Sequence, residues 1–228
     1  RKEMTGALND ETLRNLHERL LYLRNLEDKK KQVINAITEQ GKLTDDLKKK
    51  ILSAETLVAV DDLYRPYRPK KQTRATKAKE KGLEPLANIL LLQKTSRSME
   101  EEAQSFVNEA KGVANVKEAI AGAKDIIAEM IADKADYRKS IRNCTMKQGR
   151  LVVKAKDEKA ESVYEMYYDF SEPLSKITGY RVLAINRGEK EKFLTVKVEA
   201  PDAQIVNALN KTMVQDNPNT KALLEEAV

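Results

Sequence analysis

The residues best suited to chemistry in this sequence are the basic side chains between Tyr64 and Lys81. This stretch holds eight lysines and arginines against one acid, so it carries a charge of +7, while the whole chain carries +6. The positive charge is therefore local, and the remainder of the chain is close to neutral. A concentrated basic patch in a balanced chain is typical of a surface that binds phosphate groups. The predicted nucleic-acid-binding residues are Arg65, Arg68, Lys70, Lys71, Thr73, Arg74, Lys77, Lys79 and Lys81.

Two consecutive Tyr-Arg-Pro triplets, residues 64–69, predict an extended backbone at the start of this patch. Each proline disfavours the helical region for the arginine before it, and polyproline II has three residues per turn. One edge of the segment would then carry both arginines, and another edge both tyrosines. The alternative is a rigid loop whose charges are simply solvated, and the spacing alone does not separate the two interpretations.

Thr73 is predicted to cap a short helix that Gly82 ends. Arg74 and Lys77 then lie in or near the first turn, where the helix dipole disfavours cations. A bound anion would neutralise them and accept hydrogen bonds from the free backbone N–H groups. The sequence therefore predicts a phosphate-sized site lined by Lys71, Thr73 and Arg74, with long side chains swinging into solvent as the alternative.

No combination of residues indicates catalysis. His17 and Cys144 are the only histidine and the only cysteine. Neither lies in a nucleophile signature or in metal-ligand spacing, and the chain has no phosphate-binding loop. We therefore predict no catalytic residues, no metal site and no cofactor. No apolar run approaches the length that crosses a bilayer, so we also expect no membrane partner.

Five aromatic residues gather between Tyr164 and Tyr180. Nucleic-acid bases stack on such clusters in single-strand-binding proteins. Those platforms lie among basic residues, whereas this cluster is surrounded by acidic ones. A role in the core is therefore favoured for most of the cluster, and anchoring of an interface is the next interpretation.

The basic stretch also carries a family resemblance. Residues 62–71 (Asp-Leu-Tyr-Arg-Pro-Tyr-Arg-Pro-Lys-Lys), 73–76 (Thr-Arg-Ala-Thr) and 81–87 (Lys-Gly-Leu-Glu-Pro-Leu-Ala) resemble the Tex family of bacterial transcription accessory proteins. Similar segments at 1–6, 122–129 and 184–189 extend the resemblance over the whole chain.

The resemblance implies a cytoplasmic, non-catalytic protein that binds nucleic acid. The sequence shows no base-reading element, so we expect binding of RNA or DNA without sequence specificity. Its implied partners are the transcription machinery and the remaining domains of a parent protein. The family's RNase-H-like domain, helix-hairpin-helix elements and OB-fold RNA-binding domain are not visible here. The chain therefore resembles the helical region that precedes the RNase-H-like domain, and its start without Met suggests an excised fragment.

Most of the elements that must position these residues are predicted to be helices. Apolar residues recur at spacings of three and four from Leu13 to Ile37, which predicts one long helix over residues 10–40. Its buried stripe is interrupted by residues 27–31, which we interpret as a solvated middle section. Thr44 is predicted to cap a second helix that continues to the basic stretch.

The longest later helix is predicted to start after Asn115 as its cap. Gly122 within it costs about 1 kcal/mol relative to alanine. Its small neighbours Ala119 and Ala123 suggest that another helix approaches closely at this point, which would compensate for that cost.

The pattern changes at Gly149. Strands are predicted at 151–153, 180–186 and 193–198, with a turn at 187–191 and a short helix at 164–170. The predicted fold class is mainly α, a multi-helix array with a small three-stranded antiparallel β unit near residues 149–199. The predicted domains are a helical region (1–148), a small α+β unit (149–200) and a C-terminal helical segment (201–228).

Two functions are compatible with this sequence. The first is a nucleic-acid-binding scaffold that contacts phosphates through residues 65–81. The second is a helical protein-docking module that positions neighbouring RNA-binding domains or engages the transcription machinery. Salt separates them, because phosphate binding weakens steeply with salt concentration and an apolar docking face does not.

Overall fold

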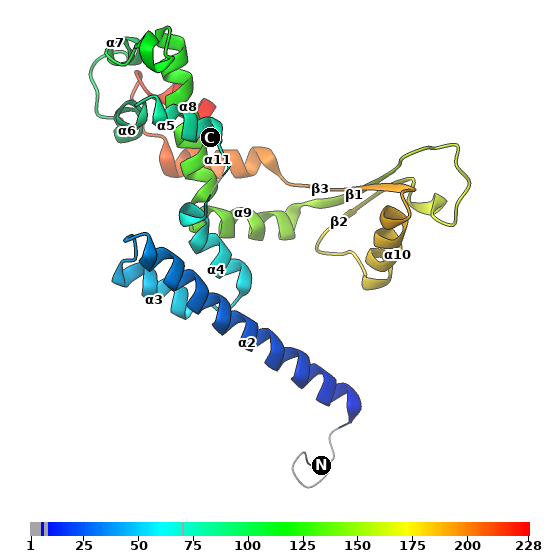
Figure 1. Cartoon of the computed structure of the whole chain (residues 1–228). Helices are drawn as coiled ribbons and strands as arrows, with labels where there is room; N and C mark the ends of the chain where they lie inside the picture. Colours follow the sequence, from blue (N-terminus) through cyan, green and yellow to red (C-terminus); the bar gives the residue numbers. More distant parts are fainter. Residues whose placement is uncertain (1–5, 7–8, 70) are drawn as a thin grey trace. The chain divides into compact units, whose positions relative to one another are not determined.

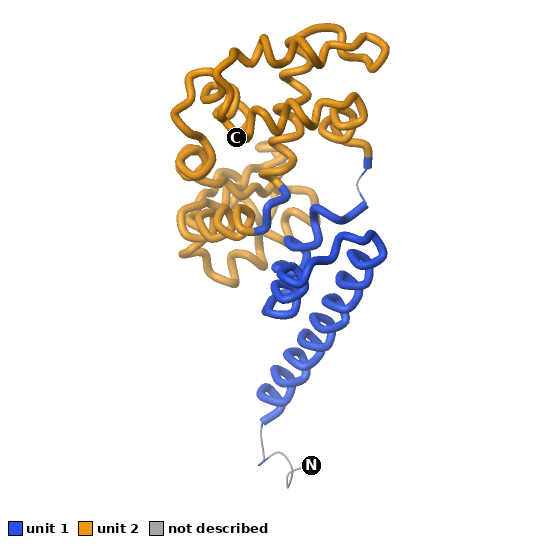
Figure 2. The backbone as a smooth tube through the Cα atoms, turned by 90° about the vertical axis from the view of Figure 1, so that its left-hand side faces the viewer, with its two compact units in different colours: residues 1–71, 133–135 blue, residues 72–132, 136–228 orange. Residues whose placement is uncertain are grey.

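The computed structural model describes residue 6 and residues 9–69 and 71–228 of the chain. Within these residues it contains 11 α-helices and one three-stranded antiparallel sheet, which confirms the predicted fold class (Figure 1). The chain divides into two compact units (Figure 2). Unit 1 comprises residues 1–71 and 133–135, and unit 2 comprises residues 72–132 and 136–228. The three-domain division stays a prediction.

The described residues of unit 1 form three α-helices and one short 3-10 helix. These are α2 (Asp10–Glu39), α3 (Asp45–Ser53), α4 (Leu57–Tyr64) and η1 (Arg65–Tyr67). Thr44 caps α3 as predicted, but the single second helix is wrong, because Thr56 caps a separate helix by accepting from the Ala59 N–H. The core of the unit consists of Leu26, Val33, Ile37, Ile51 and Val60.

The predicted buried stripe of α2 is wrong for the first half of the helix. Leu16, Leu20 and Leu23 are 59%, 44% and 41% exposed, because the packing of α3 and α4 on α2 begins only near Tyr22 (Figure 1). The predicted solvated middle section is confirmed for Glu27, Asp28 and Lys31, which are exposed. Lys30 is the exception, because it is buried and its ammonium donates to the Glu27 carboxylate (2.8 Å) and to the Leu52 carbonyl (2.9 Å).

The helical part of unit 2 packs around α8. Its helices are α5 (Arg74–Glu80), α6 (Glu84–Leu92), α7 (Met99–Gln104), η2 (Glu109–Lys111), α8 (Val116–Asp133), α9 (Ala135–Gln148), α11 (Asp202–Met213) and α12 (Lys221–Ala227). Asn115 caps α8 as predicted, since its Oδ1 accepts from the Glu118 N–H at 2.9 Å.

The close approach predicted at Gly122 is confirmed. A Cβ atom at this position would lie 2.4 Å from Leu83 Cδ1 and 3.3 Å from Ala78 Cβ. Ala119 and Ala123, on either side of Gly122, are fully buried. The absence of a side chain at Gly122 therefore lets α5 and the segment after it lie directly on α8.

The β unit differs from its prediction. The strands are β1 (Arg150–Ala155), β2 (Asp169–Pro173) and β3 (Leu194–Glu199), in the order β2-β1-β3 with both pairs antiparallel. The predicted strand at 180–186 and the predicted turn at 187–191 are wrong, because both lie in or at the end of α10 (Gly179–Lys190). The short helix predicted at 164–170 shrinks to η3 (Glu165–Tyr167), and β2 follows it.

The segment misassigned as a strand, residues 180–186, is a short and mostly apolar run, and such a run is ambiguous between strand and helix. Ile185 and Gly188, three residues apart, are the buried residues of α10. The sequence predicts Gly188 as a turn residue, but in the structure it is a helix residue that Leu194 and Tyr164 approach closely. A Cβ there would lie 2.6 Å from Leu194 Cδ1 and 3.1 Å from Tyr164 Cδ1.

The aromatic cluster belongs mostly to the core of the β unit, as favoured from the sequence. Tyr164 and Tyr167 are buried, and Tyr168 and Phe170 are partly buried against the same cluster. The exception is Tyr180, which is 65% exposed at the start of α10.

Candidate nucleic-acid interface

The first part of the basic stretch is helical, so the predicted polyproline II conformation is wrong. The helix α4 runs into η1, and Arg65 adopts helical angles although Pro66 follows it. Pro66 lies at the start of η1, where its missing N–H and fixed φ are tolerated. Tyr64 and Tyr67 pack against the core of unit 1, and this packing outweighs the local preference before proline. Only Arg68, before Pro69, is extended.

Both arginines of this segment have acidic neighbours within unit 1. Arg65 Nε lies 2.9 Å from Asp133 Oδ1, and the Asp133 side chain is only 11% exposed. Arg68 Nη2 lies 3.9 Å from Asp61 Oδ1, and Lys29 contacts the same carboxylate at 3.1 Å. Part of the predicted positive surface is therefore neutralised locally.

The boundary between the two units falls inside the predicted patch, after Lys71. Arg65, Arg68 and the exposed Lys71 belong to unit 1, and Lys70 lies outside the described residues. The predicted residues from Thr73 onward belong to unit 2 and are considered there as a separate group.

Thr73 caps α5 as the sequence predicted. Its hydroxyl oxygen accepts a hydrogen bond from the Thr76 N–H at 3.0 Å, and the same hydroxyl donates a hydrogen bond to Glu129 Oε1 of α8 at 3.0 Å. Arg74 is the first residue of α5, and its Nε lies 3.5 Å from Oδ1 of Asp125, a second carboxylate of α8. The start of α5 is thus held against α8 by two carboxylates.

Three of the predicted basic residues of α5 lie together along one groove. Arg74, Lys77 and Lys81 share a face of α5 because their spacing of three and four residues brings them to one side. They line a groove of about 230 Å³ between α5 and α8. Its other lining residues are Ala78, Leu83, Glu118, Ala121, Gly122 and Asp125.

The remaining predicted lysine of this helix, Lys79, is exposed and does not line the groove. Lys111 is a further cation near this surface, and it is not among the predicted residues. Its ammonium would lie 3.7 Å from a Cβ at Gly82, while the Lys81 ammonium donates to the Gly112 carbonyl at 2.6 Å. Lys111 stands alone in the sequence, far from the basic stretch, so no local signal marks it.

The acids of α8 were missed as well, although their spacing gave a signal. One face of α8 carries three acids, Glu118, Asp125 and Glu129. Gly122 lies on the same face, four residues after the first acid and three before the second. Two of these carboxylates supply part of the negative charge that the sequence analysis assigned to a bound phosphate. The loop entering a helix at Thr73 is confirmed, and the phosphate site itself stays a prediction.

The described residues contain no group of three or more His, Cys, Asp or Glu side chains that could hold a metal ion. His17 is exposed on α2 in unit 1, and the partly exposed Cys144 lies on α9 in unit 2. None of the helices in the described part of the chain is long and apolar enough to cross a membrane.

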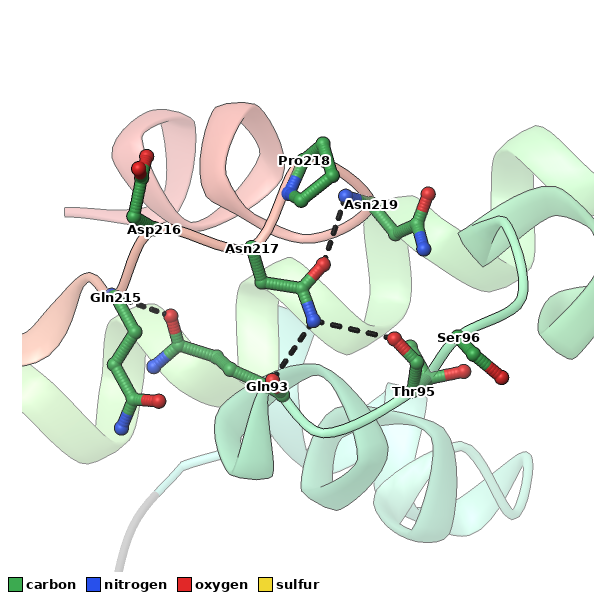
Figure 3. Close-up of a pocket in the computed structure, with 8 residues that line it drawn as sticks. All are labelled: Gln93, Thr95, Ser96, Gln215, Asp216, Asn217, Pro218 and Asn219. Carbon is green, nitrogen blue, oxygen red and sulfur yellow. Dashed lines mark hydrogen bonds between the residues drawn. The ribbon is translucent and has the colours of Figure 1, made fainter.

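A polar pocket of about 460 Å³ lies where the loop after α6 meets the loop between α11 and α12 (Figure 3). Gln93 adopts left-handed angles there, and its side-chain oxygen accepts from the Gln215 N–H at 2.7 Å. Asn217 Nδ2 donates to the carbonyls of Gln93 (2.8 Å) and Thr95 (3.2 Å). These amides tie the two loops together, which accounts for the polar lining without a ligand.

With this geometry in place, the chain can be compared with known proteins. A family model described as Tex central region-like matches residues 94–226, more than half of the chain. The chain belongs to the Tex family. A second model, described as Tex-like protein N-terminal domain, matches residues 1–38 of this Tex-family chain.

Individual relatives agree with this assignment. The protein named "Uncharacterized protein YdcI" of Bacillus subtilis is 43% identical over all of this chain and 32% of its own length. The "Transcriptional accessory protein Tex" of Neisseria gonorrhoeae is 39% identical over 87% of this chain and 26% of its own length. The human "S1 RNA-binding domain-containing protein 1" is 31% identical over 89% of this chain and 21% of its own length. This Tex-family chain therefore spans about a third or less of these relatives.

Proposed function

We propose that this Tex-family region binds the phosphate backbone of nucleic acids through the basic residues of α5 and the segment before it. The observation that carries the proposal is the groove in which Arg74, Lys77 and Lys81 converge on one side of α5. These three cations outnumber the two lining acids, Glu118 and Asp125, and the Lys111 ammonium adds positive charge near Gly82. A surface with excess positive charge attracts phosphate and releases its counterions.

The same geometry favours backbone contacts over sequence recognition. Two of the three cations in the groove are lysines. A lysine ammonium contacts phosphate as a point charge and has no fixed geometry for recognising a particular base. Reading bases requires side chains that reach base edges or aromatic rings that stack on bases. The aromatic cluster of the β unit is largely in the core. We therefore expect binding of RNA or DNA without sequence preference.

The names of two relatives support this proposal. One is called a transcriptional accessory protein, and another is named for an S1 RNA-binding domain. Both names refer to proteins much longer than this chain, which covers 26% and 21% of their lengths. The proposal for this region is a non-catalytic, cytoplasmic scaffold without a cofactor, which adds phosphate contacts to the other domains of its parent protein.

The test is a titration of the chain with single-stranded RNA and with duplex DNA at several salt concentrations. If three cations reach phosphates, replacing Arg74, Lys77 and Lys81 by alanine flattens the log-log salt slope by about two to three units. The matched control replaces the exposed Lys42, Lys48 and Lys49 of unit 1, which changes the net charge equally. An unchanged slope in the α5 variant, or equal effects in both variants, would contradict the proposal.

The proposed absence of catalysis has its own test. Pure protein incubated with Mg²⁺ and either nucleic acid or a nucleoside triphosphate is expected to leave both intact. Cleavage that disappears when one carboxylate of this chain is replaced would overturn that part of the proposal.

The second candidate function, a protein-docking module, is favoured by a different observation. The first half of α2 exposes several leucines on one side of the helix.

A further inference from the structure

One acid lies directly beside a cation of the groove between α5 and α8. Asp125 Oδ1 is 3.5 Å from Arg74 Nε, and both residues line the groove. The Arg74 side chain is 88% exposed and can swing away, whereas the Asp125 side chain is only 29% exposed. Asp125 is also fixed in place, because the next two residues of α8, Ile126 and Ile127, are buried in the core.

The second lining acid, Glu118, has a structural task at the start of α8. Its Oε2 accepts a hydrogen bond from the Ala114 N–H at 3.0 Å, and its own N–H donates to Asn115 Oδ1 at 2.9 Å. This reciprocal arrangement resembles a capping box, which satisfies backbone N–H groups at a helix end. The two acids therefore differ, since Glu118 closes a helix end and Asp125 contacts a cation of the groove.

The two lysines of the groove have no acid of their own. Lys77 is exposed, and it forms no ion pair with any residue that the structure describes. The Lys81 ammonium donates to the Gly112 carbonyl, a neutral acceptor. The row from Arg74 to Lys81 spans seven residues, or about 10 Å of helix axis. Each strand of a duplex carries one phosphate per 3.4 Å or so of its axis, so the row faces more than one phosphate.

A free phosphate and a polynucleotide meet this groove on different terms. A free phosphate that takes Arg74 must displace a carboxylate held beside it. The gain is small, because one exposed ion pair replaces another. A polynucleotide that contacts the lysines with one phosphate holds its next phosphate near Arg74 at a high effective concentration. Linked phosphates therefore displace Asp125 where separate ones do not.

We propose that Asp125 determines the specificity of the groove, by disfavouring free phosphate and mononucleotides and admitting only the linked phosphates of a polynucleotide. The proposal rests on the proposed phosphate binding. In the free protein Arg74 pairs with Asp125, and in the complex Arg74 contacts phosphate. The carboxylate that is left behind then attracts a cation from solution, which offsets one of the counterions that the nucleic acid releases.

The experiment measures binding of the whole chain to a fluorescent single-stranded RNA of about 12 nucleotides. Asp125→Asn keeps the shape of the side chain and removes its charge. This variant is expected to bind the RNA about fivefold more tightly and to steepen the log-log salt slope by up to about one unit. The matched control is Glu80→Gln, an exposed acid of α5 that does not line the groove. It changes the net charge equally and is expected to alter the affinity by less than about twofold.

Competition with inorganic phosphate tests the specificity directly. Phosphate and sodium chloride are compared as competitors at equal ionic strength, so that general screening is the same in both. With the native chain, phosphate is expected to displace the RNA no better than chloride does. With Asp125→Asn, phosphate is expected to displace it better than chloride, because Arg74 is then open to a single anion.

A double-mutant cycle separates the Arg74 contact from a general charge effect. In a chain that carries Arg74→Gln, the further change Asp125→Asn is expected to bring no gain in affinity, because the cation that Asp125 occupies is gone. All substituted side chains are at least partly exposed, so urea titration should report native-like stability for each variant.

Three results would overturn the proposal: equal affinities of Asp125→Asn and Glu80→Gln, a gain from Asp125→Asn that persists without Arg74, or native binding that phosphate disrupts better than chloride. The salt slope of the triple α5 variant tells the two proposals apart. If that slope flattens while Asp125→Asn has no effect, only the specificity proposal fails. If the triple variant has the native slope, or the native chain binds no RNA, the phosphate groove fails and this inference fails with it.

Discussion

Helix α8 and the first half of α2 carry the same apolar spacing, yet one is buried and the other is not. On α8, Ala119, Ala123 and Ile127 are fully buried by neighbouring helices. On α2, leucines at equivalent spacing are 41% to 59% exposed. Periodicity therefore identifies which face of a helix is apolar, and it does not say whether anything covers that face.

The side chains themselves differ in a way that fits the two outcomes. The packed face of α8 combines glycine and alanine with isoleucine, and the small residues let α5 come close, since a Cβ at Gly122 would lie 3.3 Å from Ala78 Cβ. The stripe of α2 consists of leucines alone. Large side chains such as leucine interdigitate with those of a partner helix. Small side chains instead allow the backbone of a neighbouring segment to come close.

The largest difference is expected for truncation of apolar side chains. Ile127→Ala on α8 should lower the free energy of unfolding by about 3 kcal/mol, because it removes a fully buried side chain and leaves a cavity. Leu16→Ala on α2 should change it by less than about 0.5 kcal/mol. Urea titration of both variants measures the two values. A comparable loss in both would mean that the first half of α2 is covered in solution.

The next effect concerns the close approach at Gly122. Gly122→Ala should destabilise the chain by about 1–2 kcal/mol, although alanine favours helix by about 1 kcal/mol. The reason is that the new methyl group meets Leu83, which is itself 1% exposed and confined. The control is Gly179→Ala, where nothing lies within 4 Å and no loss is expected. Thermal unfolding compares them, and stabilisation by both variants would refute close packing of α5 on α8.

A smaller effect is expected at the two helix caps. Thr73→Ala removes the acceptor for the Thr76 N–H and the bond to Glu129, so we expect a loss of about 1 kcal/mol in global stability. Asn9→Ala removes the cap of α2, whose Oδ1 accepts from the Thr12 N–H at 2.8 Å. Because no core covers that end, hydrogen exchange should show local fraying with little global loss. Equal global losses would show that the α2 end is coupled to a core.

The smallest effect is expected in the loop that ties α11 and α12 to α6. Lys221, whose ammonium lies 2.9 Å from Asp216 Oδ1, holds the pKa of Asp216 below its usual value. This stabilisation is present above the ordinary pKa of an aspartate and is lost as the pH falls through the lowered pKa. Asp216→Asn should therefore be slightly less stable than the native chain at neutral pH, with the difference vanishing in acid. Urea titrations at both pH values measure it.

Local chemistry made several parts of the fold predictable. Thr44, Thr73 and Asn115 each cap a helix where the sequence indicated. A cap is decided by a side chain and a backbone N–H two or three residues away, so it needs no distant contact. The failure at residues 64–69 has the opposite cause, since packing of Tyr64 and Tyr67 against a core outweighed the local preference. At residues 180–186 the local pattern was ambiguous, and contacts with distant residues decided it.

The candidate site shows the same division. The sequence by itself determined where the positive charge is concentrated and which residues of α5 share a face, because both follow from order along the chain. Only the tertiary structure decided that α8 faces α5 with Asp125 and Glu129, that the Lys111 ammonium lies near Gly82, and that the leucines of α2 are exposed. These outcomes depend on which segments far apart in the sequence come together, and no spacing within a single helix encodes that.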